Sequence, residues 1–326
     1  MLEVGKLDSD LLKKIVFDKL TFKRPEIIIR PGIGEDCAVI DYGEYECVMS
    51  TDPITAAVEN IGHLAIHISC NDIASNGIEP IGILLAVMLP PGTTENQIEE
   101  IMRQAAETAE KLGVEIIGGH TEITAAVNQP IIVSTAIGRG SKNSSQTVND
   151  MKEGDYILLT KDAGIEGTAI IAGEKDLSDV IEEEELCLAK SFAEEVSVVQ
   201  EGCIAGRIGT HGMHDVTEGG VLGAVWEMCQ VAQLGCEVYC DKIPIRNLTK
   251  KICKKFDINP LRLISSGCMM IACDEEKRDV IIKKMEENNI KCTCIAKVMP
   301  REFGIKFKDG EEIEPPESDE LYKAID

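Results

Sequence analysis

The sequence predicts an α/β (α+β) protein with two αβ domains of similar size. Its 326 residues are a length that allows about two domains. Strand-like apolar runs alternate with helical patterns in both halves of the chain. A polar, glycine-containing stretch, residues 138–155, separates the halves. We therefore expect an N-terminal domain over residues 1–145 and a C-terminal domain over residues 146–326.

The first half contains helices with clear boundary signals. Thr94 begins a long helical pattern, and Gly113 suits its C-cap. Helices are expected at residues 11–20, 60–76 and 94–112, with Asp8 or Ser9 capping the first. Strands are expected at residues 37–41, 46–51, 80–89, 114–117 and 131–137.

The second half repeats the alternation of helices and strands. Helices are expected near residues 166–172, 181–193, 196–208, 217–234 and 275–288. Strands are expected at residues 156–160, 268–273, 291–298 and 303–308. The segment after Asp309 is acidic and contains prolines, so we expect it to be loosely held.

The composition excludes several classes of partner. A formal net charge of -24 argues against nucleic-acid binding and against attraction to anionic membranes. No secretory leader and no run of roughly 18 apolar residues is present, which predicts a cytoplasmic protein without a membrane span. The thirteen cysteines do not have zinc-site spacing and are interpreted as small buried hydrophobic residues.

The first candidate site is the segment Gly32-Ile33-Gly34-Glu35-Asp36. Its glycines would let backbone amides approach phosphate oxygens, and Asp36 could hold a Mg²⁺ ion that binds the same phosphates. The segment is neither a Walker loop nor a Rossmann fingerprint. By itself, a tight turn before a strand explains it equally well.

Two further candidates carry carboxylates. Asp52, in Ser50-Thr51-Asp52-Pro53, follows a strand and could be an ordinary turn residue. Asn71 and Asp72 stand inside an otherwise apolar helix, so at least one must be exposed, paired or functional.

The last candidates contain histidine next to glycine or aspartate. In Gly118-Gly119-His120-Thr121-Glu122 a strand is expected to open into a loop, where His120 could meet a phosphate or a metal. The segment His214-Asp215-Val216-Thr217-Glu218-Gly219-Gly220 stands just ahead of an expected helix, whose N-terminus could attract an anion. Asp215 or Thr217 could equally be only the cap of that helix.

Together these segments resemble the superfamily of aminoimidazole ribotide synthetase. It includes thiamine monophosphate kinase, selenophosphate synthetase and the hydrogenase-maturation dehydratase HypE. The motifs, in chain order, are GIGEDCAVI, STDP, NDIASNGIEP, GGHTE, HDVTEGG and SSG. The resemblance implies a homodimer in which the N-terminal sheets of two copies form a barrel-like core. It also implies an ATP site near that interface, closed by the C-terminal domain.

The resemblance assigns roles to individual residues. Metal ligands on the ATP phosphates would be Asp36, Asp52, Asp72 and Asp215. Further contacts to the nucleotide would come from Gly32, Gly34, Asp36, Gly118, Gly119 and Thr121. Catalytic roles would fall to Asp72, Asn71 and His120, although many relatives have an acid where this chain has His120. The implied cofactors are ATP and Mg²⁺.

The pattern is most similar to HypE, which uses ATP to dehydrate a carbamoyl group carried on a C-terminal cysteine. The last cysteine here is Cys294, so we expect another substrate, either a small molecule or a protein-borne group. We expect phosphoryl transfer to a carbonyl-type oxygen. Alternatives are a small-molecule kinase or synthetase, with selenide chemistry disfavoured because no cysteine precedes Cys37, and a nucleotide-binding regulator without turnover.

Overall fold

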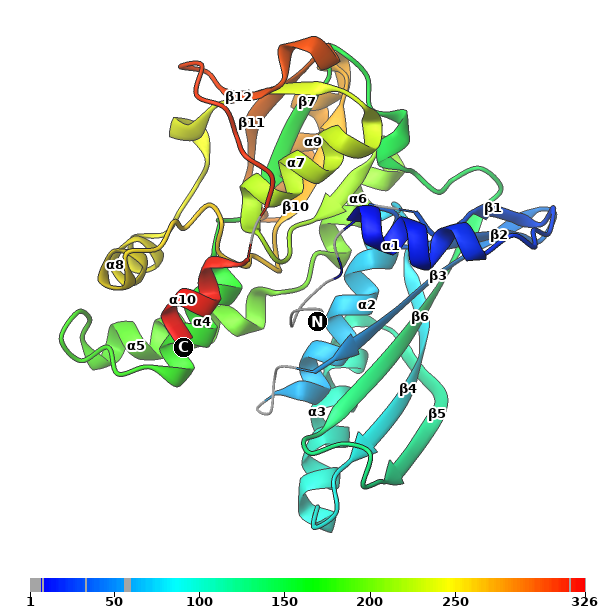
Figure 1. Cartoon of the computed structure of the whole chain (residues 1–326), viewed down its shortest axis with the longest axis vertical. Coiled ribbons are helices and arrows are strands. Elements are labelled where there is room, and N and C mark those ends of the chain that lie inside the picture. Colours follow the sequence, from blue (N-terminus) through cyan, green and yellow to red (C-terminus); the bar gives the residue numbers. More distant parts are fainter. Residues whose placement is uncertain (1–6, 8, 33, 56–59, 317, 326) are drawn as a thin grey trace.

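The computed structural model describes residues 7, 9–32, 34–55, 60–316 and 318–325. It contains two lobes, each built on a six-stranded sheet (Figure 1). This mixed α/β architecture confirms the predicted fold class. Among the described residues, no helix is long and apolar enough to cross a membrane.

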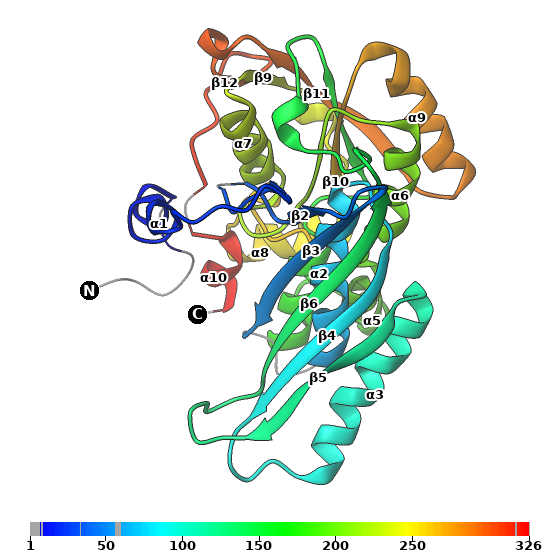
Figure 2. The same ribbon diagram turned by 90° about the vertical axis from the view of Figure 1, so that its right-hand side faces the viewer.

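The first sheet belongs to the N-terminal half and has the strand order β1-β2-β3-β6-β4-β5. All neighbouring strands are antiparallel except β4 and β5, which are parallel. Its strands are β1 (Ile27–Ile29), β2 (Ala38–Asp41), β3 (Tyr45–Ile54), β4 (Pro80–Leu89), β5 (Glu115–Ile123) and β6 (Ile131–Ser141). Figure 2 shows helices behind this sheet, while no helix or strand among the described residues covers its other face, called the bare face below.

The helices of the first lobe are α1 (Ser9–Ile15), α2 (Ile61–Ser75) and α3 (Glu95–Leu112), with a 3-10 turn, η1 (Phe17–Lys19), after the first. Thr94 and Gln97 form a capping box that starts α3, and Gly113 ends it in the left-handed conformation. Helix α1 is shorter than expected, and the proposed cap Asp8 lies outside the described residues.

The second sheet has the order β12-β9-β11-β7-β10-β8. Its strands are β7 (Tyr156–Thr160), β8 (Met213–Asp215), β9 (Gly235–Val238), β10 (Met269–Cys273), β11 (Cys292–Met299) and β12 (Ile305–Phe307). The helices of this lobe are α4 (Ile165–Glu174), α5 (Glu183–Ser191), α6 (Val199–Ile208), α7 (Gly220–Ala232), α8 (Asn247–Phe256), α9 (Glu275–Glu287) and α10 (Glu320–Ile325). Four short 3-10 turns complete it: η2 (Val148–Asp150), η3 (Phe192–Glu195), η4 (Cys240–Lys242) and η5 (Arg301–Phe303).

Two local expectations are wrong. Strand β5 does not end before Gly118 but continues through Gly118 and Gly119 to Ile123. Gly119 has φ 148°, and a Cβ there would lie 1.9 Å from the Leu85 carbonyl oxygen, so only glycine fits this close strand contact. Helix α7 begins at Gly220, not at Thr217.

The acidic C-terminal segment is also better held than expected. Asp319 is 5% exposed, and its carboxylate accepts hydrogen bonds from the backbone N–H groups of Gly219, Ile264 and Leu321. Leu321 packs into the core beside α4 and α8. A capping carboxylate and buried apolar side chains therefore fix this segment against the second lobe.

The lobes are joined by close packing of α2 against α6. A Cβ on Gly202 would lie 2.2 Å from the Ala74 carbonyl oxygen, and one on Gly206 would lie 2.5 Å from backbone atoms of Gly77. The helix backbones therefore touch without side chains between them.

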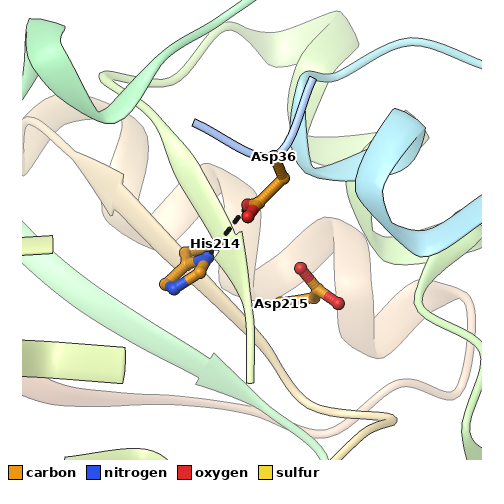
Figure 3. A group of neighbouring side chains, drawn as sticks. All are labelled: Asp36, His214 and Asp215. Carbon is orange, nitrogen blue, oxygen red and sulfur yellow. Dashed lines mark ion pairs between the residues drawn. The ribbon is translucent and has the colours of Figure 1, made fainter. Parts of the chain in front are cut away.

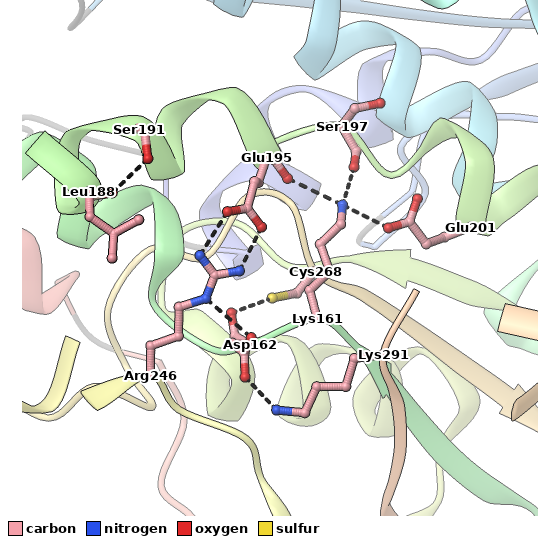
Figure 4. A network of polar contacts seen from close by, with 10 residues as sticks. All are labelled: Lys161, Asp162, Leu188, Ser191, Glu195, Ser197, Glu201, Arg246, Cys268 and Lys291. Carbon is pink, nitrogen blue, oxygen red and sulfur yellow. Dashed lines mark hydrogen bonds and ion pairs between the residues drawn. The ribbon is translucent and has the colours of Figure 1, made fainter. Parts of the chain in front are cut away.

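A polar network holds the segment that leads into α6 (Figure 4). Arg246 donates to both carboxylate oxygens of Glu195, at 2.7 and 2.6 Å. Lys161 donates to the carbonyl oxygens of Glu195 and Ser197 and pairs with Glu201 at 2.7 Å. Both cations come from the second lobe and fix the loop at the junction.

Candidate active site

Four carboxylates from distant parts of the chain lie near one another at the junction of the lobes. Asp52 lies in β3, Asp72 in α2 and Asp215 in β8, while Asp36 precedes β2. Ser50 Oγ is 2.5 Å from Asp72 Oδ2 and 3.3 Å from Asp52 Oδ2. The charges of the other three carboxylates all act on Asp72. The structure thus brings together the four acids that the sequence suggested as metal ligands.

The loop that carries Asp36 is fixed by the second lobe. Gly34 has φ 70°, and a Cβ there would lie 2.3 Å from Val231 Cγ2 in α7. The Glu35 carboxylate accepts hydrogen bonds from Thr147 at 3.2 Å and from Asn149. Gly32 belongs to this loop, and Ile33 lies outside the described residues. The loop is therefore shaped by lobe-to-lobe contacts and directs Asp36 at β8.

Two of the acids are buried and strongly perturbed. Asp72 is 7% exposed and Asp215 is 2% exposed. Burial, followed by the charges of neighbouring carboxylates, raises the pKa of Asp72 well above its usual value. Burial and the charge of Asp36 raise the pKa of Asp215 to about 7. Oδ2 of Asp215 is buried and has no hydrogen-bond partner among the described residues. Buried carboxylates that repel one another are costly, so a bound cation would stabilise this cluster.

His214 lies beside Asp36 and Asp215, and its ring pairs with the Asp36 carboxylate (Figure 3). Its Nδ1 is 3.3 Å from Asp36 Oδ2, and its Nε2 is 3.0 Å from Glu227 Oε2. Burial lowers the pKa of His214, but its hydrogen bonds and ion pairs with Asp36 and Glu227 outweigh burial and raise that pKa well above its ordinary value. One ligand atom each of Asp36, His214 and Asp215 lie within 4.8 Å of one another.

Asn71 points away from the acids. Its Nδ2 donates to the Val196 carbonyl oxygen at 2.8 Å, and its Oδ1 accepts from the Val198 N–H at 2.9 Å. The side chain is fully buried. Its amide therefore ties α2 to the loop before α6, and this geometry favours a structural role over the catalytic one suggested by the sequence.

The Gly118-Gly119-His120-Thr121 segment is also apart from the acids of its own chain. It lies in β5, at the exposed edge of the first sheet, and the His120 side chain is 68% exposed. Across the first sheet, Asp52 on β3 pairs with Ser134 on β6. Ser134 pairs with Leu85 on β4, and Leu85 pairs with Gly119 on β5. Three strand spacings separate Asp52 from Gly119, a distance of roughly 14 Å.

Reasoning from the sequence missed three residues of this site: Ser50, His214 and Glu227. His214 stands beside the selected Asp215, so its position in the motif was a usable signal. Glu227 is in the middle of α7, and its contact with His214 follows only from the packing of α7 beside β8. Ser265 of the SSG motif is fully buried, and its Oγ accepts a hydrogen bond from the Gly164 N–H at 2.6 Å.

Comparison with known proteins shows the family of this chain. The model of the N-terminal domain of AIR synthase related proteins matches residues 34–140, and that of the C-terminal domain matches residues 152–307. The chain belongs to the AIR synthase related proteins. This confirms the family that the motifs indicated.

Several curated proteins are similar over most of this AIR synthase related chain. A hydrogenase expression/formation protein of Methanocaldococcus jannaschii is 28% identical, covering 87% of this chain and 84% of its own length. The carbamoyl dehydratase HypE of Rhodobacter capsulatus is 24% identical, with 86% and 82% covered. A thiamine-monophosphate kinase of Methanospirillum hungatei is 28% identical, with 67% and 74% covered.

Solved structures of similar fold include members with partners or ligands. A HypE–HypF complex contains a chain that matches with a TM-score of 0.76 and 20% identity, covering 94% of this chain and 99% of that one. HypE in complex with ATP matches with a TM-score of 0.72 and 21% identity, covering 98% of each chain. At these identities the likeness concerns the fold.

Proposed function

We propose that this chain is an ATP- and Mg²⁺-dependent enzyme that activates a carbonyl-type oxygen by phosphoryl transfer, as a HypE-like member of its family. The main support for the proposal is that four carboxylates lie close together at the junction of the two lobes. They are Asp36, Asp52, Asp72 and Asp215. The ATP complex of a HypE of the same fold supports nucleotide binding.

The donor set suits magnesium on phosphates. Mg²⁺ prefers carboxylate oxygens together with phosphate oxygens and waters. When bound, it would neutralise charge on the phosphates and orient them for transfer. We expect Asp52 and Asp72 to hold such an ion, and Ser50 Oγ lies within hydrogen-bond distance of both carboxylates. These ions would let a chain of net charge -24 accept ATP.

The chain's own contribution is positioning. Asp36 follows Gly34 and Glu35, which both contact the second lobe: Gly34 packs against Val231, and the Glu35 carboxylate accepts a hydrogen bond from Asn149. The γ-phosphoryl group would pass from ATP to the substrate oxygen: the bond between the γ-phosphorus and the β-phosphate oxygen breaks as the new oxygen–phosphorus bond forms, and ADP leaves. Catalysis of this kind depends mainly on fixed geometry and charge.

We also propose that the protein acts as a homodimer, paired through the bare face of the first sheet. Leu84 of β4 stands between the buried Ile83 and Leu85, so its side chain points to the opposite face of the sheet, and it is 37% exposed; Ile81 and Ile117 on β4 and β5 are each 49% exposed. Exposed apolar side chains on a sheet face indicate a contact surface. Since Gly119 lies about 14 Å from Asp52 of its own chain, we expect a second copy to bring its 118–121 segment to the acids. With that copy, Gly118, Gly119, His120 and Thr121 would contribute to nucleotide binding.

An ATPase assay tests the proposal. We expect Mg²⁺-dependent ATP hydrolysis by the wild-type chain, and a fall of about 100-fold or more in Asp72→Asn, because a phosphate–metal anchor is removed. Asp279→Asn, on exposed α9, is the control and should be fully active. Absence of turnover with any carbamoyl donor, combined with tight ATP binding, would instead favour a nucleotide-binding regulator.

A small-molecule kinase is the second candidate, because a thiamine-monophosphate kinase is 28% identical to this chain over 235 residues. The two reactions differ in product. A kinase retains the phosphoryl group on its product, whereas dehydration releases inorganic phosphate. Following the ³²P label from γ-labelled ATP with thiamine monophosphate and with a carbamoylated thiol peptide separates these reactions.

A further inference from the structure

We propose that the groove between α6 and α9 binds an acidic amphipathic helix of another protein. The two helices lie side by side in the second lobe (Figure 2), and the groove between them has a volume of about 400 Å³. None of the residues that line it belongs to the group of four carboxylates. The proposal therefore does not depend on the reaction proposed above.

Helix α6 lines the groove with one face and joins the lobes with another. Its groove-lining residues are Ile204, Arg207 and Ile208, which are spaced i, i+3 and i+4 and so share one face. Gly202 and Gly206, which touch α2, lie on the opposite face, because successive helical residues turn by about 100°. A partner in the groove would therefore contact the side of α6 that faces away from α2.

Helix α9 also separates its anchoring face from its groove-lining face. Ile281 and Met285 are fully buried in the core. Val280, Lys283 and Lys284 line the groove instead, and Val280 is 53% exposed. Together with the two isoleucines of α6, this valine gives the groove an apolar lining, which is typical of a contact surface.

The charged side chains of the groove are mainly positive. Arg207 and Lys283 have no ion-pair partner among the described residues, whereas Lys284 pairs with Glu287 at 3.0 Å. The chain as a whole has a formal net charge of -24. A positive groove on so acidic a chain favours a partner with carboxylates and disfavours one with a basic surface.

An acidic amphipathic helix has both properties that the groove requires. The ridge of a third helix fills the space between two packed helices, with apolar side chains at i, i+4 and i+7. Its apolar side chains would contact Ile204, Ile208 and Val280, and flanking carboxylates would pair with Arg207 and Lys283. Because exposed ion pairs contribute little affinity, these pairs would mainly set specificity and the association rate.

Binding of a synthetic peptide tests this inference. The probe is a fluorescent, helix-stabilised peptide with leucines at i, i+4 and i+7 and glutamates beside them, and the control peptide has lysines in place of the glutamates. In anisotropy titrations at low salt, we expect the wild-type chain to bind the acidic peptide at least about tenfold more tightly than the lysine peptide. Binding should weaken as the salt concentration rises.

Charge reversal in the groove should remove the preference for the acidic peptide. We expect Arg207→Glu and Lys283→Glu each to weaken its binding by about tenfold, because like charges then face each other. Lys254→Glu, at an exposed position of α8, is the matched control and should bind the peptide as the wild type does. All three side chains are exposed, so the variants should melt at the wild-type temperature.

Equal binding of the two peptides, or unchanged binding in the Arg207→Glu and Lys283→Glu variants, would overturn the inference. Light scattering distinguishes a second copy of this chain as the occupant. A wild-type mass above that of a dimer, reduced by Lys283→Glu, would assign the groove to self-association and overturn the assignment to another protein. Because these measurements do not involve ATP, failure of the proposed reaction would not affect their outcome.

Discussion

Asp215 is a buried carboxylate whose charged form is destabilised in the folded protein. Burial and Asp36 raise its pKa to about 7, above the unfolded value of about 3.9. Because the folded pKa is the higher one, the stability associated with this group is complete below about pH 4 and is lost as the pH rises towards 7. Bound divalent ions should restore it.

Asp215→Asn should therefore stabilise the metal-free protein while impairing metal binding. At pH 8 we expect the free energy of unfolding to rise by roughly 1–3 kcal/mol, and at pH 4 we expect little change. Thermal melts in EDTA across this range measure the effect. A stabilisation that is the same at both pH values would contradict the assigned burial cost.

Asn71 offers a test between a structural and a catalytic role. Asn71→Ala leaves the Val196 carbonyl oxygen and the Val198 N–H without their partner, so we expect a loss of about 2–3 kcal/mol of stability. Denaturant unfolding measures this loss, and Asn128→Ala on an exposed loop is the control. Unchanged stability with lost turnover would restore the catalytic assignment.

At the residue scale, the sequence drew attention to the four acids that the fold brings together, because carboxylates in apolar or glycine-rich surroundings need an explanation. The sequence could not show that the Asn71 side chain connects α2 to the loop before α6, because the partners of Asn71 are backbone groups more than a hundred residues away. The same holds for Glu227, whose partner His214 becomes a neighbour only when β8 and α7 pack together.

At the element scale, the helix boundaries that depend on local caps were predicted well, as with Thr94 and Gly113. The expected strand end before Gly118 was wrong, because paired glycines usually favour turns. Here they permit β5 to approach β4 closely, which depends on sheet packing rather than on local preference.

The helix crossing between the lobes has its own test. Gly202→Ala should destabilise the protein by about 1–3 kcal/mol, because its Cβ would overlap the Ala74 carbonyl oxygen. Gly173→Ala in α4 is the matched control, since a Cβ there meets no atom within 4 Å. The control should be neutral or stabilising by up to about 1 kcal/mol. Equal effects of both changes on the unfolding midpoint would contradict the close crossing.

At the scale of the whole molecule, the two-lobed α/β architecture followed from the alternation of elements in both halves. Contacts between lobes and between copies did not, because sequence periodicity shows that a face is apolar but not what covers it. The domain limits at residues 145 and 146 and the homodimer therefore stay predictions.

Leu84→Glu tests the proposed dimer. A charge on the bare face of the first sheet should shift the protein to a monomer, since an unpaired buried carboxylate is costly at an apolar interface. Light scattering at micromolar concentration measures the mass. Leu188→Glu, which replaces an exposed leucine (54%) on α5, should leave the mass unchanged. A wild-type monomer at this concentration would remove the paired-sheet proposal.

The dependence of ATP binding on divalent metal tests the central proposal most directly. In calorimetric titrations, we expect the wild-type chain to bind ATP with Mg²⁺ or Mn²⁺ and to lose at least tenfold in affinity in EDTA, with Asp72→Asn weak under both conditions. Equal ATP affinity with and without divalent ions, unchanged by Asp72→Asn, would show that the four carboxylates are not the phosphate-binding centre.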